Sequence, residues 1–166
     1  MDRPKTVALY ALLKRYDLDA AKPLEGWFAQ ISLDHTVALM QDGRTKEAEA
    51  FVKGIEKNSP ELLRADGAIT ADKAVSKAGS IAEARNWERA GWDSLEAGKV
   101  EEAQAAFQKS EKAYPSFRQS FEISKYIDAH KTELSDPTTQ KMAVDALVEK
   151  HSFSAPKNLK NRLGRP

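Results

Sequence analysis

The amino-acid sequence predicts an all-α protein made of antiparallel helical hairpins, and three observations support this. Apolar residues recur every three or four positions in most segments, which is the period of an α-helix. Glycine and proline separate these segments at the places where a helix would end. A stretch near residue 100 also repeats features of an earlier stretch with a shift of 55 residues, which indicates a repeated structural unit.

The composition is that of one ordinary helical domain. The chain has 166 residues, of which 41% are hydrophobic and 31% charged, enough to bury a sizeable core. The formal net charge is +1, so no overall polarity points to nucleic acid or to acidic lipid. There is no cysteine in the sequence, which excludes disulfides, thiol nucleophiles and thiolate metal ligands.

No run reaches the roughly 18 consecutive apolar residues that indicate a membrane span. The most apolar N-terminal run, 7–13, is followed by charged residues, whereas a secretory signal has its charges first and a cleavage site afterwards. We therefore predict that this run belongs to the first core helix, with Leu9 and Leu12 among its apolar positions. The lack of a signal sequence or a membrane span in this chain favours a cytoplasmic location.

The first part of the chain is predicted to contain three helices, over 6–16, 24–40 and 45–57, with a connection over 17–23. Gly43 is predicted to end the second helix, because glycine accepts the left-handed conformation that often follows a helix C-terminus. The third helix has one apolar face. These segments therefore supply at least one antiparallel hairpin.

The stretch 61–80 is less regular. We expect Gly79 to interrupt it. Ser80 and Glu83 match a capping box, in which each side chain satisfies a backbone donor of the other residue. We therefore expect the next helix to cover 81–97.

The chain is organised around 87–115, where two helical patterns flank Gly98. The residues that mark this unit are Trp87, Ala90, Gly91, Ser94, Ala103, Phe107 and Pro115. Their spacing resembles the tetratricopeptide repeat, W-x2-L-G-x2-Y…A-x3-F…P, and departs from it at Ala90 and Ser94. The resemblance covers about 84–117 and implies helical hairpins stacked as a short right-handed solenoid.

A second, degraded copy of this unit covers about 29–62. Under the shift of 55 residues, the matches are Gly43 with Gly98, Glu47 with Glu102, Ala48 with Ala103, and Pro60 with Pro115. Adjacent repeats of this family would lie about 34 residues apart, so about 21 residues separate the copies. We assign this excess to an insert at 61–80.

Two further helices, over 117–130 and 138–150, are predicted to form a third hairpin that caps the open hydrophobic end of the stack. We therefore assign 1–150 to one helical domain. The remaining stretch, 151–166, carries four Lys or Arg and no acidic residue. We predict that it is a flexible basic tail.

Helix packing explains the signature residues. Gly91 and Ala103 are small, which lets two helices cross closely, and Trp87 and Phe107 are predicted to be the large fillers of the same interface. These residues therefore indicate a fold and do not specify a ligand. Residues that bind a partner are expected beside them.

The family resemblance implies a concave groove that binds a peptide or a segment of a partner protein. The residues expected to face it are Arg85, Glu88, Arg89, Trp92, Glu122 and Tyr126. Arg85 and Arg89 lie one turn apart and suit a carboxylate, and Trp92 would supply an apolar anchor. Two alternatives remain open: the arginines pair with Glu88 or Glu122 on a solvated face, or Trp92 is buried by the neighbouring hairpin.

Residue patterns for catalysis or for metal binding are missing from the sequence. The three histidines are far apart and include no pair at helical spacing for a metal ion. Gly91, Gly98 and Lys99 do not match a phosphate-binding loop, because six residues instead of four separate the glycines. We therefore predict a protein that is not an enzyme and that has no cofactor.

Two other functions remain as alternatives to partner binding in a groove. The chain would be a structural or oligomerising subunit of a larger assembly, which includes self-association. Otherwise the tail, with Lys157, Lys160, Arg162 and Arg165, would contact the phosphates of nucleic acid or an anionic membrane. The second alternative is less favoured, because few aromatic or apolar residues are interleaved with these charges.

Overall fold

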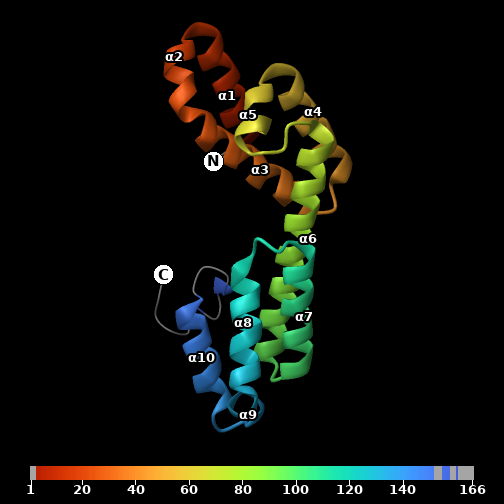
Figure 1. Ribbon diagram of the computed structural model, residues 1–166, viewed down its shortest axis with the longest axis vertical. Coiled ribbons are helices and arrows are strands. Elements are labelled where there is room, and N and C mark those ends of the chain that lie inside the picture. Colours follow the sequence, from red (N-terminus) through yellow and green to blue (C-terminus); the bar gives the residue numbers. More distant parts are fainter. Residues whose placement is uncertain (1–2, 152–154, 158–159, 161–166) are drawn as a thin grey trace. The chain divides into compact units, whose positions relative to one another are not determined.

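A computed structural model describes residues 3–151, 155–157 and 160 of the chain (Figure 1). The secondary-structure elements of these residues are all helices, and none of them is a strand. The predicted all-α class is therefore confirmed. The chain divides into two compact units, Met1–Ala82 (unit 1) and Glu83–Pro166 (unit 2), and each is described by itself.

Unit 1 contains three of the helices that the periodicity predicts. Its elements are α1 (Arg3–Tyr16), α2 (Leu18–Ala21), the 3₁₀-helix η1 (Lys22–Leu24), α3 (Glu25–Gln41), α4 (Thr45–Asn58), α5 (Pro60–Ala65) and the first part of α6 (Ala71–Glu96). The helices predicted over 6–16, 24–40 and 45–57 correspond to α1, α3 and α4. The predicted connection over 17–23 is wrong, because this stretch is helical as α2 and η1.

The core of unit 1 forms where α1 packs against α3. Tyr10 of α1 is almost fully buried, and its ring lies 4.9 Å from that of Phe28 between ring centroids. Burial raises the pKa of the Tyr10 phenol, and the carboxylates of nearby glutamates raise it further. The run 7–13 does lie in a helix that contributes to the core, but two of its apolar residues, Leu9 and Leu12, are exposed, at 57% and 52%.

Helix α6 begins at Ala71, ten residues before the predicted start at 81. The backbone N–H of Ala71 donates a hydrogen bond of 2.8 Å to Oε1 of Glu56 in α4, which satisfies a donor at the helix N-terminus. The predicted break at Gly79 is wrong as well, because this glycine lies inside α6. The N–H of Lys73 also donates a hydrogen bond of 3.4 Å to the hydroxyl of Thr70, so a local and a distant contact together mark the start of this helix, and the Ser80–Glu83 pattern does not.

Unit 2 contains the rest of α6, followed by α7 (Val100–Ala113), α8 (Arg118–Ala129), α9 (Lys131–Ser135) and α10 (Gln140–Lys150). The helices predicted over 117–130 and 138–150 correspond to α8 and α10. The short helix α9 is not predicted. Asp136 accepts a hydrogen bond of 2.9 Å from the backbone N–H of Thr138, which forms the turn before α10.

The internal similarity of the sequence has a structural counterpart. With a shift of 55 residues, the end of α3 falls on the end of α6, and both ends of α4 fall on those of α7. Gly43 and Gly98, in the two turns, have φ of +72° and +74°. The ion pair after each turn is also repeated, as Arg44 with Glu47 at 2.6 Å and Lys99 with Glu102 at 3.2 Å. The two hairpins are therefore built alike.

The core of unit 2 contains a different tryptophan from the one predicted. Trp92 is fully buried, and its ring meets that of Phe107 edge-on at 5.6 Å between centroids. Trp87 is only half-buried, and the ammonium of Lys109 lies 4.2 Å above its ring. The predicted close crossing at Gly91 is confirmed, because an added Cβ would lie 2.7 Å from Cε2 of Phe107.

The chain continues to pack against unit 2 after α10. His151 and Ala155 are buried, and Nε2 of Gln119 donates a hydrogen bond of 3.5 Å to the carbonyl of His151. Of the basic residues proposed for the tail, Arg162 and Arg165 lie outside the described residues.

Candidate functional site

Three of the predicted binding residues lie on successive turns of α6 in unit 2. Arg89 is exposed, whereas Arg85 and Glu88 are half-buried. Arg85 and Glu88 are each already engaged in an interaction with another residue. The structure therefore does not show Arg85 and Arg89 as two arginines that are both available to bind a carboxylate of a partner.

Trp92 is the predicted binding residue whose environment differs most from the expectation. Its side chain has no exposed surface, and it shares one core with Val144 and Leu147 of α10. Its indole N–H is buried and has no hydrogen-bond partner among the described residues. Burial by neighbouring helices, the alternative that the sequence left open, is the environment that the structure shows, so Trp92 does not present an apolar anchor at the surface.

The last two predicted residues lie on α8. Glu122 is exposed and close enough to His151 to raise its pKa, although burial lowers that pKa more strongly. The ring of Tyr126 lies 4.2 Å from that of His130, and it packs against the core that contains Trp92. Trp92 and Tyr126 therefore contribute to the same packed cluster, Trp92 from inside it and Tyr126 from its partly exposed edge.

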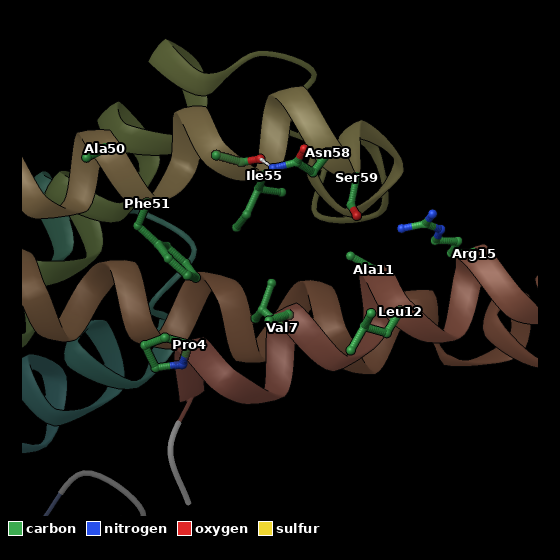
Figure 2. A pocket seen from close by; sticks show the side chains of 12 residues that line it. Pro4, Val7, Ala11, Leu12, Arg15, Ala50, Phe51, Ile55, Asn58 and Ser59 are labelled. Atoms are coloured by element: carbon green, nitrogen blue, oxygen red, sulfur yellow. Dashed lines mark hydrogen bonds between the residues drawn. The ribbon is translucent and has the colours of Figure 1, made fainter.

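Another part of the molecule has the shape of a binding site. An open, mainly apolar groove of about 720 Å³ lies between α1 and α4 in unit 1 (Figure 2). The residues that line it are Pro4, Val7, Ala8, Ala11, Leu12 and Arg15 from α1, Ala50, Phe51, Gly54, Ile55 and Asn58 from α4, and Ser59. Figure 2 shows Phe51 and Ile55 pointing from α4 toward α1, and Val7 pointing back.

The groove exists because α1 is apolar on more than one face. Tyr10 points into the core, whereas Val7, which is also buried, and Leu12 lie on the groove side. Leu9 and Tyr16 continue this surface on the outer side of α1, at 57% and 81% exposure. The apolar run of α1 is wider than one buried stripe of a helix, and unit 1 leaves part of it exposed.

The polar groups of the groove are few and lie at one end of it. The side-chain amide of Asn58 donates a hydrogen bond of 2.9 Å to the carbonyl of Gly54, so its own helix satisfies it. The guanidinium of Arg15 points into the space beside Ser59 (Figure 2). It forms no ion pair with any residue in the described part of the chain.

A row of lysines follows the side of α4 that faces away from the core. Lys46, Lys53 and Lys57 are exposed, and spacings of seven and four residues place them on one side of the helix, beside Ala50 and Gly54. The residues that line the groove include no carboxylate. The groove is therefore apolar in its floor and positively charged at its edge.

One feature of the sequence indicates a second apolar surface on α1, although helical periodicity does not show what that surface faces. The run 7–13 consists entirely of apolar residues, and a single buried face of a helix takes only about half of such a run. The surplus on α1 is visible in the sequence. The surface that it faces on α4 depends on tertiary structure.

Comparison of the chain with protein-family models, with characterised protein sequences and with solved structures gives no match. Among the described helices, none is both long enough and apolar enough to cross a lipid bilayer. The same residues contain no group of three or more His, Asp or Glu side chains arranged to hold a metal ion.

Proposed function

We propose that this chain is a protein–protein interaction module and that its contact surface is the groove between α1 and α4. The groove itself is the observation that carries the proposal, together with Leu9, Leu12 and Tyr16, which extend its apolar surface along α1. Contiguous exposed apolar surface of this kind marks interaction sites on soluble proteins. A groove between two helices is also a common receptor for a third helix.

The repeated hairpins support an interaction module of the tetratricopeptide kind. The two hairpins share helix ends, a glycine turn and an ion pair under one shift of 55 residues. Repeats of this kind build extended binding surfaces from simple helical units. Stacking of the hairpins as a right-handed solenoid stays a prediction. The burial of Trp92 favours the α1–α4 groove over the surface around Arg85 and Arg89 as the place where a partner binds.

A cysteine cross-linking experiment tests this proposal, because the chain has no cysteine of its own. Ala50→Cys places one thiol in the groove, and Ala146→Cys places one on α10 in unit 2 as the matched control. Both alanines are exposed helical residues. Each variant is coupled to a photoreactive group and irradiated in an extract of the native host, and the products are identified by mass spectrometry.

We expect Ala50→Cys to give a discrete cross-linked protein that Ala146→Cys does not give. Adding Leu12→Glu should remove this product, because a charge at the groove wall opposes apolar contact. Equal labelling by both cysteines, or no product from either, would contradict binding in the groove. A product between two copies of this chain would support the alternative of an oligomerising subunit.

A further inference from the structure

We infer that the groove between α1 and α4 receives an amphipathic α-helix of another protein whose apolar stripe is flanked by acidic residues. This inference rests on the proposed function, since it names the kind of partner that the same site binds. Shape, charge and the composition of this chain support it separately.

The length of the groove fits a helix of about three turns. Eleven residues separate Pro4 from Arg15 along α1, which is about 16 Å of helix at 1.5 Å per residue. A helix of that length presents apolar residues at i, i+3 or i+4, and i+7 along one side. The groove is open between the two helices, as Figure 2 shows, so a partner helix can enter from the side.

Small residues of this chain leave room for large residues of the partner. Ala8, Ala11, Ala50 and Gly54 alternate with larger side chains along the groove. A Cβ added to Gly54 would meet no atom within 4 Å. Leucine or phenylalanine side chains from the partner would fill this space and contact Phe51, which is only half-buried.

The charges around the groove favour acidic flanks on the partner. Arg15 lies at one end of the groove, and Lys46 and Lys57 lie along the exposed side of α4. Two nearby carboxylates are already paired, since Glu61 contacts Lys14 at 2.8 Å and Glu47 contacts Arg44 at 2.6 Å. The other carboxylates of α4, Glu49 and Glu56, lie by helical spacing on the far side of the lysines from Ala50 and Gly54. The charge nearest the groove is therefore positive, and complementary charge raises association rate and specificity.

The chain itself offers no suitable occupant. Its C-terminal stretch from 150 to 166 has five Lys or Arg and no acid, so its charge has the same sign as that of the groove. In a second copy, Leu9, Leu12 and Tyr16 of α1 form an exposed apolar stripe, but α1 carries only basic charges, so it has the same sign as the groove. The other exposed large apolar residues among those described are Leu24, Trp27, Ile69 and Met142. They do not form a three-turn stripe on one helix. The occupant is therefore expected to come from a different protein.

Two synthetic peptides test the inference. Each is an amphipathic helix of about 14 residues, roughly four turns, with the same leucine stripe. One has glutamates beside the stripe and the other has lysines. Binding of each fluorescent peptide to the full chain is measured by fluorescence anisotropy at about 0.15 M salt. We expect the acidic peptide to bind about tenfold more tightly, because several partly screened ion pairs contribute.

The second part of the peptide-binding experiment reverses charges on α4. Lys46→Glu combined with Lys57→Glu should remove the preference for the acidic peptide or reverse it. Lys141→Glu combined with Lys150→Glu is the matched control, since both are exposed lysines on α10, and it should keep the preference. Circular dichroism checks that both double variants remain helical.

Three results would overturn the inference. They are equal binding of the two peptides, no binding of either, and binding to vesicles that contain about one-third anionic lipid in place of the peptides. Failure here is distinguishable from failure of the proposed function. If Ala50→Cys cross-links to a protein but the acidic peptide does not bind, the groove is an interaction site for a different kind of partner.

Discussion

The α3–α4 hairpin of unit 1 and the α6–α7 hairpin of unit 2 match in the end of the first helix, the glycine turn and both ends of the second helix. They differ in the residues that fill the space where the two helices cross. In unit 2, Gly91 faces Phe107 so closely that an added Cβ would lie 2.7 Å from the ring. In unit 1, the residues at these positions are Thr36 and Val52, both buried. A pair of one very small and one large residue is replaced by two residues of intermediate size.

The hydroxyl groups of unit 1 do not disturb this arrangement. Ser32 and Thr36 each donate a hydrogen bond of 2.8 Å to the carbonyl four residues earlier in α3. Buried hydroxyls can satisfy themselves in this way inside a helix. A cavity of about 10 Å³ remains beside Val52 and Leu62. The comparison teaches that total volume at the helix crossing matters more than the identity of either residue.

The largest expected effect is in the α6–α7 hairpin and concerns the two tryptophans of α6. Trp92→Ala should lower the free energy of unfolding of unit 2 by about 3–5 kcal/mol, because a fully buried ring is lost and a cavity forms. Trp87→Ala should cost much less, since that ring is half-exposed. Urea denaturation, with hydrogen exchange at amides of α7, measures both values. Similar losses for the two variants would contradict the assignment of Trp92 to the core.

A second experiment gives the helix crossing of unit 2, at Gly91 and Phe107, the residues that unit 1 has at the same positions. Gly91→Thr should destabilise unit 2 by about 1–3 kcal/mol through overpacking against the buried Phe107 ring. Phe107→Val should also destabilise it, by leaving a cavity. The double variant should cost about 0.5–3 kcal/mol less than the sum, because each change relieves the other. Strict additivity in a double-mutant cycle would show that the two sites do not share one packing volume.

The two glycine turns differ in the residues that lie against them. Removing the contact at the Gly98 turn is expected to change stability less than the substitutions at Trp92 or Gly91. Nothing lies within 4 Å of a Cβ added to Gly43, whereas one added to Gly98 would lie 2.9 Å from Nε2 of Gln140. The same amide donates a hydrogen bond of 3.2 Å to the carbonyl of Leu95. Gln140→Ala should therefore destabilise unit 2 by about 0.5–1.5 kcal/mol.

Thermal unfolding measures the effect of Gln140→Ala. The control is Lys141→Ala, which changes an exposed residue of the same helix and should have little effect. Equal shifts of the midpoint temperature in the two variants would mean that the contact of Gln140 with the turn contributes nothing to the stability of unit 2.

The smallest expected effect is a pH dependence that belongs to unit 2. Burial lowers the pKa of His151, the charge of Lys150 lowers it further, and Glu122 partly opposes both. Below the ordinary pKa of about 6.5 the unfolded chain therefore binds a proton more readily than the folded one. As the pH falls through this range, unit 2 should lose stability.

His151→Gln isolates this contribution. Between about pH 7.5 and pH 5.5, the wild-type chain should lose more stability than the variant, because only the wild type carries a buried imidazole whose pKa is lowered. Chemical denaturation at both pH values measures the difference. Identical losses in the two proteins would mean that His151 takes up its proton equally well in the folded and unfolded chain.

The sequence alone determined the helices of the two hairpins and the turns between them. Apolar periodicity, together with the turn at Gly43, located both ends of α3 and α4 to within one residue, and Gly98 marked the turn before α7. These features depend on neighbours within a few positions, because a helix and its end are specified by local spacing and by residues that accept a positive φ. The close approach at Gly91 was also predictable from residue size.

Only the tertiary structure decided which residues those helices bury. The contact of Glu56 in α4 with the first residue of α6 joins residues 15 positions apart, and it adds to the local hydrogen bond from the N–H of Lys73 to the hydroxyl of Thr70. The choice of Trp92 over Trp87 for the core depends on which helices surround α6, and a pattern of apolar spacing fits either ring. The groove between α1 and α4 likewise needs two helices far apart in sequence. Burial is a property of the whole arrangement, because a side chain leaves water only where another part of the chain covers it.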